Sequence, residues 1–536
     1  IIKTIDANRD RILGIIQETP EGLELRPVEK KARDRYSITG KNIGIGKVGD
    51  VVLADPLPAR GSKNKNCKVV EILGNEGDTN IFSLISAHEN NLSLTFPDAV
   101  LKETENMDVP SPKGRDDLRS IPLVTIDDAV FAEPDPDQAR NPGGFHLMVA
   151  IADVAYYVEH SKPLDREALR RSNSTYFPDR VIPMLPEVLS NGLCSLRPNE
   201  NRACMAVHLY IDQDGELQKY KFVRGLMKSV ARLTYEQVQA AKDGLTDDTT
   251  SHIMDEVINP LYDAFAILRK AREKRGALDL DLPERQILIT EKGQMTGVTR
   301  RARLDAHMLI EEFMVLANVA SALALSKSKT NGIYRIHDLP KAEKLDNART
   351  FLEGFGLSLP KGNKPTPAGL NMILKKARSL EYAPLINQTI LRTQSQAIYS
   401  PENIGHFGLA LTHYTHFTSP IRRYADLIVH RALIREFNLG PGGLKDDEVM
   451  RLDEICETIS TNERKSMSAE YATTDRFVAR FMEDKVGAEF EGRISGLSRF
   501  GLFVALTESG ADGIIPIRTL PDDFYIHDEE QHALIG

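Results

Sequence analysis

Short runs of alternating apolar and polar residues open this chain, and they predict a small β-barrel. Turn residues separate the runs, as expected for several short strands of one barrel or sandwich. The expected strands are Arg11–Ile16, Gly22–Arg26, Gly49–Ala54 and Lys68–Leu73. We therefore place a first barrel at residues 1–75, followed by a connector at 76–119 that several prolines interrupt.

A large mixed region of strands and helices follows, from residue 120 to residue 484. The run Phe145–Ala152 is almost continuously apolar, which predicts a strand buried on both of its faces. Apolar residues at helical spacing in Arg303–Asn318 predict a helix with one apolar side. The charged segment Asp446–Asp484 is also expected to be helical.

Strand-like runs return at the end of the chain, in residues 485–536. They are Gly487–Ile494, Gly501–Leu506 and Asp512–Ile517, and they predict a second small barrel. The chain stops before such a barrel would close, and it opens without an initiator Met. Both ends therefore look trimmed.

Composition is that of an ordinary globular protein and decides little about function. The chain has 536 residues, a formal net charge of −9 and four scattered cysteines, so no disulfide framework or Cys-rich metal site is expected. We find neither a run of about 18 apolar residues nor a signal peptide, and we expect a cytoplasmic protein. The acidic total argues only weakly against nucleic acid, because binding depends on local charge.

The most specific chemistry lies in the segment His413–Arg431, whose sequence is HYTHFTSPIRRYADLIVHR. An Arg pair beside Ser and Thr hydroxyls suits the bidentate capture of phosphate oxygens. Together with Asn403–Leu409, this segment resembles the signature of the RNB exoribonucleases, the family of ribonuclease II and ribonuclease R. Its amino-acid sequence resembles that of ribonuclease R more than that of ribonuclease II.

The resemblance implies a multidomain architecture, in which a mixed α/β RNB catalytic domain lies between two OB-fold barrels. The first barrel would be of the cold-shock type, and the second would be the OB-type RNA-binding module of a large ribosomal protein. The implied function is a processive, Mg²⁺-dependent 3′→5′ exoribonuclease that hydrolyses single-stranded RNA with a free 3′ end to nucleoside 5′-monophosphates. We expect a monomer with no membrane partner.

The segment Thr125-Ile-Asp-Asp-Ala129 matches part of the metal site of that family. Family members carry a short acidic loop whose aspartates, with the flanking ones, hold Mg²⁺; Asp127 matches the first aspartate and Asp128 the last. Here the two are adjacent, and neighbouring residues of an extended strand point to opposite faces, which suits one Mg²⁺ poorly. Either the protein has lost the loop and is inactive, or it has a mobile loop between Asp127 and Asp128 that this sequence omits. We favour the second explanation, with further Asp ligands in that loop and two ions.

Other residues match the family one by one. Tyr176 matches an aromatic residue that stacks on a base near the RNA 3′ end, and Tyr235 matches a tyrosine that packs on the terminal nucleotide. The resemblance assigns ribose contacts to Glu311 and Glu470, phosphate neutralisation in the transition state to Arg422, and RNA contact to Arg423. Leu280 stands where relatives often have a stacking Phe, so stacking there is in doubt.

Two other classes of function stay open at the level of sequence. One is a catalytically inactive RNA-binding protein on the same scaffold, and the other is a scaffolding protein that binds neither RNA nor metal. In the C-terminal module, Phe500 and Phe503 are further candidates for stacking on bases. Strand alternation predicts that only one of these two rings faces outward.

Overall fold

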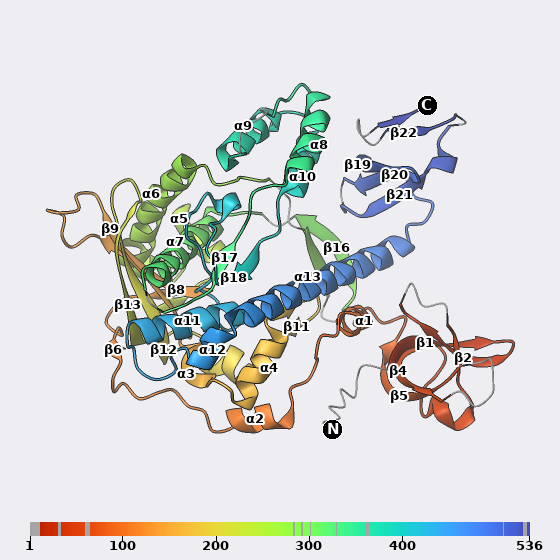
Figure 1. The fold of residues 1–536 in the computed structure, drawn as a ribbon, viewed down its shortest axis with the longest axis horizontal. Helices are drawn as coiled ribbons and strands as arrows, with labels where there is room; N and C mark the ends of the chain where they lie inside the picture. Colours follow the sequence, from red (N-terminus) through yellow and green to blue (C-terminus); the bar gives the residue numbers. More distant parts are fainter. Residues whose placement is uncertain are drawn as a thin grey trace.

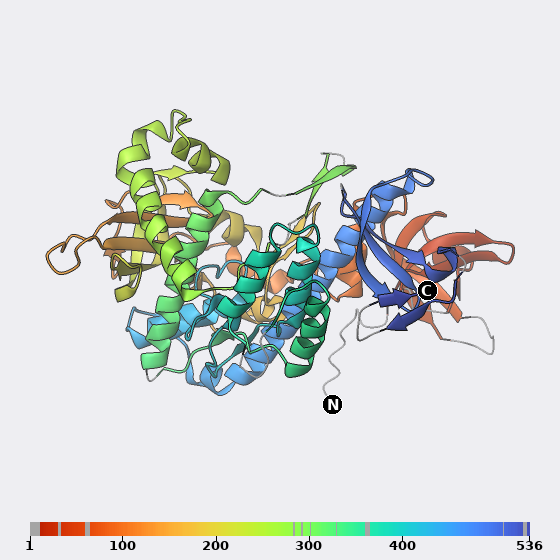
Figure 2. The ribbon, with the colours of Figure 1, turned by 90° about the horizontal axis from the view of Figure 1, so that it is seen from above.

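The computed structural model places two small β modules at one end of a large α/β body (Figure 1). The N-terminal strands, in red, lie below the C-terminal strands, in blue, and helix α13 (Leu452–Glu483) runs from the body toward the latter. A view from above shows both modules at the same end of the molecule (Figure 2). The structure describes residues 11–29, 34–58, 65–281, 285–290, 293–300, 302–328, 330–359, 365–507, 509–521, 523–528 and 533–536.

The N-terminal module is a closed five-stranded barrel with the strand order β1-β2-β3-β5-β4. Ile16, Leu25 and Val52 fill its interior, as alternation of apolar residues along short strands requires. All four strands predicted from the sequence are present, while the first ten residues of the predicted barrel lie outside the described residues. The strands are β1 (Ile12–Thr19), β2 (Gly22–Pro27), β3 (Tyr36–Ser37), β4 (Asp50–Leu57) and β5 (Lys65–Asn75).

A seven-stranded sheet forms the centre of the body, in the order β14-β7-β8-β9-β12-β13-β6. Neighbours pair antiparallel except at the two edges, where β14 lies parallel to β7 and β6 parallel to β13. Residues 146–152 of β9 are all buried, which confirms the predicted strand with two covered faces. The strands are β6 (Asp116–Asp117), β7 (Val124–Ile126), β8 (Asp128–Pro134), β9 (Phe145–Ala152), β12 (Asn201–Ile211), β13 (Leu217–Lys228) and β14 (Ala231–Arg232).

Helix α7 (Asp305–Lys327) packs against strands β9, β12 and β13 and contacts α5, α6 and α11. It confirms the helix predicted from apolar spacing and is longer than predicted. By length and composition it could cross a membrane, but 78% of its apolar window is buried, as in a core helix. The other helices of the body are α3 (Val154–Tyr157), α4 (Pro163–Arg171), α5 (Tyr235–Lys242), α6 (Asn259–Arg275), α11 (Tyr424–Glu436) and α12 (Asp446–Met450).

Three helices build a lobe with a separate apolar core above the body. Leu280 packs against this core, so in this structure its side chain serves the lobe rather than an open stacking surface. Three two-stranded antiparallel sheets complete the central region, and the strands of one of them, β17 and β18, flank the lobe in the chain. The lobe consists of α8 (Ala342–Glu353), α9 (Pro367–Ala377) and α10 (Ala383–Thr393), and the small sheets of β10 (Thr175–Tyr176) with β11 (Val181–Ile182), β15 (Arg285–Ile289) with β16 (Met295–Arg300), and β17 (Tyr334–Ile336) with β18 (Ile398–Ser400).

The C-terminal module has a three-stranded sheet in the order β19-β20-β21 and a separate pair, β22 with β23. Phe500 is 61% exposed and Phe503 is 43% exposed, so the prediction that only one ring faces outward is wrong. The reason is local, because Phe500 lies in the turn before β20 and is not bound by strand alternation. The strands are β19 (Gly492–Ser498), β20 (Gly501–Leu506), β21 (Asp512–Pro516), β22 (Ile526–Asp528) and β23 (Ala533–Ile535).

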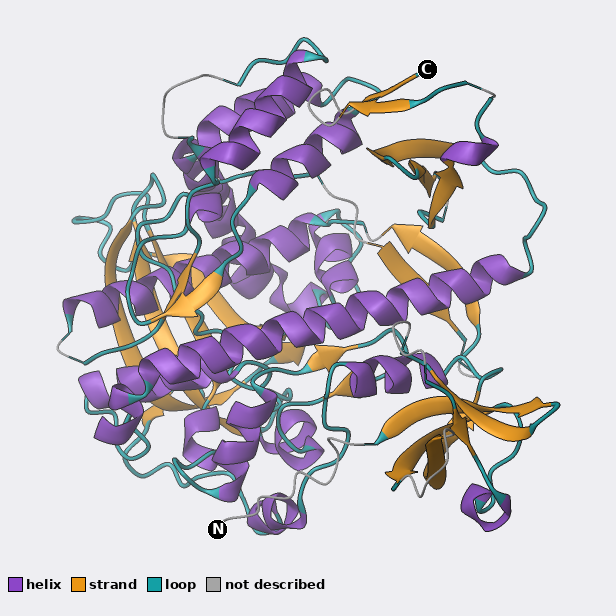
Figure 3. Cartoon of the chain, turned by 45° about the vertical axis from the view of Figure 1, so that its right-hand side comes forward, coloured by secondary structure: helices purple, strands orange, loops and turns teal. Residues whose placement is uncertain are grey.

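Helix α1 (Ile81–Glu89), in the connector, joins the N-terminal barrel to the body (Figure 3). Its Phe82 ring meets Phe477 of α13 edge to face, with ring centroids 5.3 Å apart. Glu89 accepts two hydrogen bonds from Arg476 of the same helix, at 2.8 and 2.7 Å. The second connector helix is α2 (Asp98–Thr104). The barrel is therefore anchored to the helix that also leads to the C-terminal module.

Candidate functional site

The Arg pair of the signature segment lies immediately before helix α11, and its two guanidinium groups have different surroundings. Arg423 donates two hydrogen bonds to the fully buried carboxylate of Asp426, at 2.7 and 2.8 Å. The backbone N–H of Ser419 donates a third bond to Asp426, at 2.7 Å. A bidentate pair that is also hydrogen-bonded to the backbone is rigid, so the Arg423–Asp426 pair fixes the conformation of this segment, and RNA contact by Arg423 stays a prediction.

Arg422, in contrast, is exposed. Among the described residues, its guanidinium has one hydrogen bond, a long one of 3.4 Å to the Ser419 hydroxyl. The adjacent Arg423–Asp426 pair holds the backbone that carries it. Arg422 is thus the guanidinium of the pair that can meet an incoming phosphate.

The segment before β10 pairs directly with the Arg pair. Asn173 and Arg423 form an isolated antiparallel bridge. Ser174 N–H donates to the Arg422 carbonyl at 3.0 Å, and Tyr424 N–H donates to the Ser172 carbonyl at 2.8 Å. Tyr176 lies two residues further along, so backbone hydrogen bonds set its position relative to Arg422.

Tyr176 presents an exposed ring beside helix α13. The ring residue is 49% exposed, while its backbone N–H donates to Glu470 Oε1 at 2.7 Å. One residue earlier, the Thr175 hydroxyl donates to the Ser466 hydroxyl at 2.9 Å. Burial raises the pKa of Glu470, and the bond from Tyr176 opposes this shift. The arrangement leaves the ring free to stack on a base and gives one oxygen of Glu470 a structural role.

Asp127 and Asp128 lie at the junction of β7 and β8. Ile126 pairs with Asp128 across the two strands, so Asp127 alone forms the turn, with a φ of 63°. Such a left-handed backbone is uncommon outside glycine, although Asp and Asn tolerate it best. The strands are therefore joined directly in this chain, and the acidic loop with the further Asp ligands that we expected is not part of it. Because Asp127 lies in a turn, the strand-alternation argument does not apply to the pair.

The Asp128 carboxyl is perturbed by its surroundings. Burial raises its pKa from 3.8 to about 7; the Arg422 charge opposes this shift, and the Asp127 charge adds to it. Arg423 and Asp426 act on the same carboxyl, with opposite signs. These electrostatic partners place Asp128 in the neighbourhood of the Arg pair, although the two segments are far apart in the sequence.

This pKa gives a test of the site by pH. The folded state holds the Asp128 proton up to about pH 7, whereas the unfolded state releases it near pH 3.8, so the contribution of Asp128 to stability falls between these values as pH rises. We expect the free energy of unfolding of Asp128→Asn, relative to wild type, to rise over this window by at most about 1.4 kcal/mol per pH unit. Urea unfolding at both ends of the window measures this change. The same relative stability at both ends would contradict the shifted pKa.

The carboxylates of this site do not complete a metal centre. Among the described residues, no group of three or more His, Cys, Asp or Glu side chains is placed to hold an ion. Tyr235 donates its hydroxyl to Asp127, and both oxygens of Asp426 are engaged by Arg423. Mg²⁺ needs near-octahedral oxygen ligation, and Asp127 with Asp128 could supply only part of it. Asp127 and Asp128 alone therefore do not form a complete Mg²⁺ site.

Tyr235 and Glu311 lie near the N-terminal ends of two neighbouring helices, α5 and α7. Tyr235 is the first residue of α5, and its ring lies parallel to that of His307, with centroids 4.1 Å apart. Glu311 lies one turn beyond His307 on α7. Its two oxygens accept hydrogen bonds from Arg272 and Arg303, at 2.9 and 2.8 Å. A ribose hydroxyl that binds Glu311 would have to share a carboxylate oxygen with one of these arginines or displace that arginine.

Sequence reasoning missed two residues of this site. Asp426 had a signal in its position three residues after Arg423, in the first turn of the helix that the segment enters, where a carboxylate is favoured. His307 had a weaker signal, its position four residues before Glu311 and thus on the same helix face. His307 on α7 stacks on Tyr235 on α5, 72 residues earlier in the chain, and no local sequence pattern predicts this contact.

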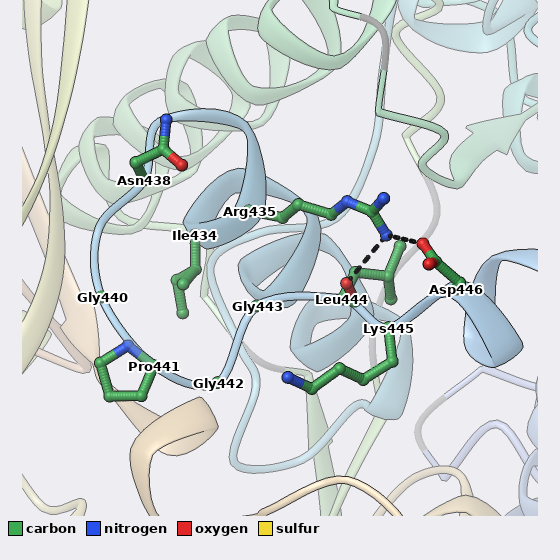
Figure 4. A pocket seen from close by; sticks show the side chains of 10 residues that line it. All are labelled: Ile434, Arg435, Asn438, Gly440, Pro441, Gly442, Gly443, Leu444, Lys445 and Asp446. Atoms are coloured by element: carbon green, nitrogen blue, oxygen red, sulfur yellow. Dashed lines mark hydrogen bonds and ion pairs between the residues drawn. The ribbon is translucent and has the colours of Figure 1, made fainter.

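A pocket of about 350 Å³ lies at the opposite end of α11 from Arg422 (Figure 4). Its Arg435 pairs with Asp446 at 2.8 Å and donates to the Leu444 carbonyl at 3.1 Å. The other lining residues are Ile434, Asn438, Gly440, Pro441, Gly442, Gly443 and Lys445. The pocket therefore contains none of the candidate site residues, and its guanidinium is already neutralised.

Comparisons with known proteins agree with this architecture. An RNB domain matches residues 115–437, an S1 RNA binding domain matches residues 483–536, and a cold shock domain matches residues 25–97. The ribonuclease R of Vibrio parahaemolyticus is 38% identical over 516 residues, which cover 91% of this chain and 61% of that protein. The ribonuclease R of Aquifex aeolicus is 36% identical over 558 residues, covering 100% of this chain and 77% of that protein.

A solved structure is similar over nearly the whole chain. Mycoplasma genitalium RNase R, in complex with ribose methylated single-stranded RNA, superposes with a TM-score of 0.90 at 27% identity, covering 98% of this chain and 85% of that one. The present chain spans about three fifths of the length of the Vibrio relative. More than half of the chain matches the RNB model. The chain therefore belongs to the RNB family, with a cold-shock module before the RNB domain and an S1 module after it.

Proposed function

We propose that this protein is a processive 3′→5′ exoribonuclease that hydrolyses single-stranded RNA from a free 3′ end and releases nucleoside 5′-monophosphates. The observation that carries the proposal is the exposed Arg422, whose charge acts on the Asp128 carboxyl and whose backbone carbonyl accepts a hydrogen bond from Ser174, two residues before Tyr176. A phosphate-binding guanidinium, acidic side chains and a base-stacking ring thus share one site. The relatives named ribonuclease R support the same activity.

In this proposal each residue has a separate task. Tyr176 stacks on a base near the 3′ end, and such stacking contributes about 1–3 kcal/mol per base with little sequence preference. Arg422 approaches the scissile phosphate and neutralises the charge that builds up on its oxygens during hydrolysis. Arg423, held by Asp426, keeps Arg422 in place. The barrels bind the RNA backbone and guide a single strand inward.

We also propose that hydrolysis depends on Mg²⁺. Ribonucleases of the RNB family are generally metal-dependent. An Mg²⁺ ion is often held by one or two protein carboxylates together with substrate phosphates, and Asp127 and Asp128 are the candidate carboxylates here. Bound ions would activate water and stabilise the attacking and leaving oxygens. Because the two aspartates do not complete a site, the remaining oxygen ligands must come from RNA, water or further carboxylates.

End-labelled single-stranded RNA tests the activity and the metal together. We expect mononucleotides to accumulate with Mg²⁺, no degradation with excess EDTA, and recovery when Mg²⁺ is added back. RNA bound but never degraded would show an inactive RNA-binding protein on this scaffold, and absence of RNA binding would show a scaffolding protein.

A further inference from the structure

Two helix N-termini meet beside Asp127, those of α5 and α7. Helix α5 begins at Tyr235, and a capping box of Thr234 and Gln237 fixes its first turn. The side chain of Gln239 on α5 accepts a hydrogen bond from the backbone N–H of Ala306 on α7, at 3.2 Å. The first turns of both helices are therefore fixed relative to each other by a polar bridge.

Tyr235 is constrained at two points. Its hydroxyl donates a hydrogen bond to Asp127 Oδ2, which ties the tip of the side chain to the β7–β8 junction. One face of its ring lies against His307, with centroids 4.1 Å apart and ring planes only 14° from parallel. The hydroxyl bond alone would allow the ring to rotate about the axis through its oxygen, and the stacked His307 restricts that rotation.

His307 is itself anchored. Its Nδ1 accepts a hydrogen bond from the backbone N–H of Leu304 at 3.2 Å, across the first turn of α7. Glu311 lies four residues further, so His307 and Glu311 share one face of α7. The face that supports Tyr235 is thus continuous with the carboxylate that the resemblance assigns to the terminal ribose.

We propose that His307 is a positioning residue, which holds the Tyr235 ring in the orientation that packs on the 3′-terminal nucleotide. This inference rests on the proposed function, because Tyr235 can pack on a 3′-terminal nucleotide, as the family resemblance implies, only if the protein binds RNA by its 3′ end. His307 acts through Tyr235 and does not touch the reacting phosphate. Its aromatic face does the positioning, and its Nδ1 bond serves only to cap α7.

Two substitutions separate the face from the cap. His307→Gln removes the ring and keeps an acceptor that can reach the backbone N–H of Leu304, as Gln does at this position of a capping box. His307→Phe keeps a flat ring against Tyr235 and removes the acceptor. The matched pair therefore tests stacking and capping one at a time, and thermal melts show whether each variant is folded.

Binding of single-stranded RNA labelled at its 5′ end, so that the 3′ end stays free, is measured by fluorescence anisotropy in EDTA, where hydrolysis cannot interfere. We expect His307→Gln to raise Kd about three- to tenfold, the range of an aromatic pair, and His307→Phe to stay within about twofold of wild type. In a Tyr235→Ala background, His307→Gln should have no further effect, because the two residues act as one unit. Under steady-state conditions with Mg²⁺, KM should rise more than kcat falls.

Three results would overturn the inference: equal Kd for wild type and His307→Gln, a loss in His307→Phe as large as in His307→Gln, or a full additional loss in the Tyr235→Ala background. If wild type binds RNA but never degrades it, the proposed function fails. The Kd values of the His307 and Tyr235 variants, alone and combined, then still decide the role of His307. If wild type degrades RNA and His307→Gln is unchanged in binding and KM, the proposed function stands and this inference fails. A wild type that binds no RNA overturns both.

Discussion

Substitution of Arg422 by Ala is expected to lower the turnover of single-stranded RNA by about 10²- to 10³-fold, the loss typical of removing one preorganised group that stabilises transition-state charge. RNA affinity should change little, because the stacking residues and the β modules remain. The guanidinium is exposed, and its long bond to Ser419 costs little to lose. Single-turnover degradation of end-labelled RNA, with anisotropy for binding, measures both effects.

Two variants serve as controls for this result. Arg422→Lys keeps the charge without the forked geometry and should recover only part of the turnover. Arg435→Ala removes an arginine from the C-terminal end of α11, the helix that follows Arg422, and should leave turnover unchanged. Unchanged turnover in Arg422→Ala would refute the role given to this arginine, and an equal loss in Arg435→Ala would point to a general effect on α11.

The largest expected effect on stability comes from Arg431, whose side chain is buried within α11. Arg431 is 1% exposed, and it donates to Asp165 at 2.7 Å and to Glu448 at 2.6 Å. Removing one partner of a buried ion pair leaves the other charges buried and unpaired, at a cost of about 3–5 kcal/mol. We expect Arg431→Ala to lower the free energy of unfolding by this amount, as measured by urea unfolding followed by circular dichroism.

The matched control is Arg451→Ala, which removes an exposed arginine paired with Glu454 at 2.9 Å. Exposed pairs contribute only about 0–1 kcal/mol, so this variant should resemble wild type. A loss below about 1 kcal/mol in Arg431→Ala would show that the buried network tolerates the removal of its cation. Because α11 begins just after the Arg422–Arg423 pair, we also expect Arg431→Ala to lose turnover at temperatures below the global unfolding transition.

The regular elements follow closely from local patterns. Alternation of apolar residues placed the four strands of the first barrel, the apolar run predicted β9, and helical spacing predicted α7. These patterns are informative because burial of one face or of two faces leaves a periodic signature in the sequence. The order of strands in the central sheet, by contrast, depends on which segments pair, and β6 and β14 are too short to carry any pattern.

The candidate site was only partly predictable. The signature segment pointed to Arg422, and the resemblance supplied Tyr176, Tyr235, Glu311 and Glu470 as candidate contacts. The local sequence did not show which of the two arginines pairs with Asp426, because this pairing depends on the burial of Asp426 in the folded protein. The surroundings of Leu280 and Phe500 could not be predicted from the sequence either. Leu280 packs against the core of the helical lobe, and Phe500 lies in a turn that exposes its ring.

The sequence by itself therefore determined the family, the succession of modules and the segment that we propose to bind phosphate. Only the tertiary structure decided that Arg422 is the exposed guanidinium, that Asp127 turns the chain with its carboxylate bonded to Tyr235, and that His307 supports that ring. The physical reason is that an element depends on the periodicity of neighbouring residues, whereas a site depends on side-chain pairs between distant segments. The hydrogen bond between Tyr235 and Asp127 spans 108 residues of sequence.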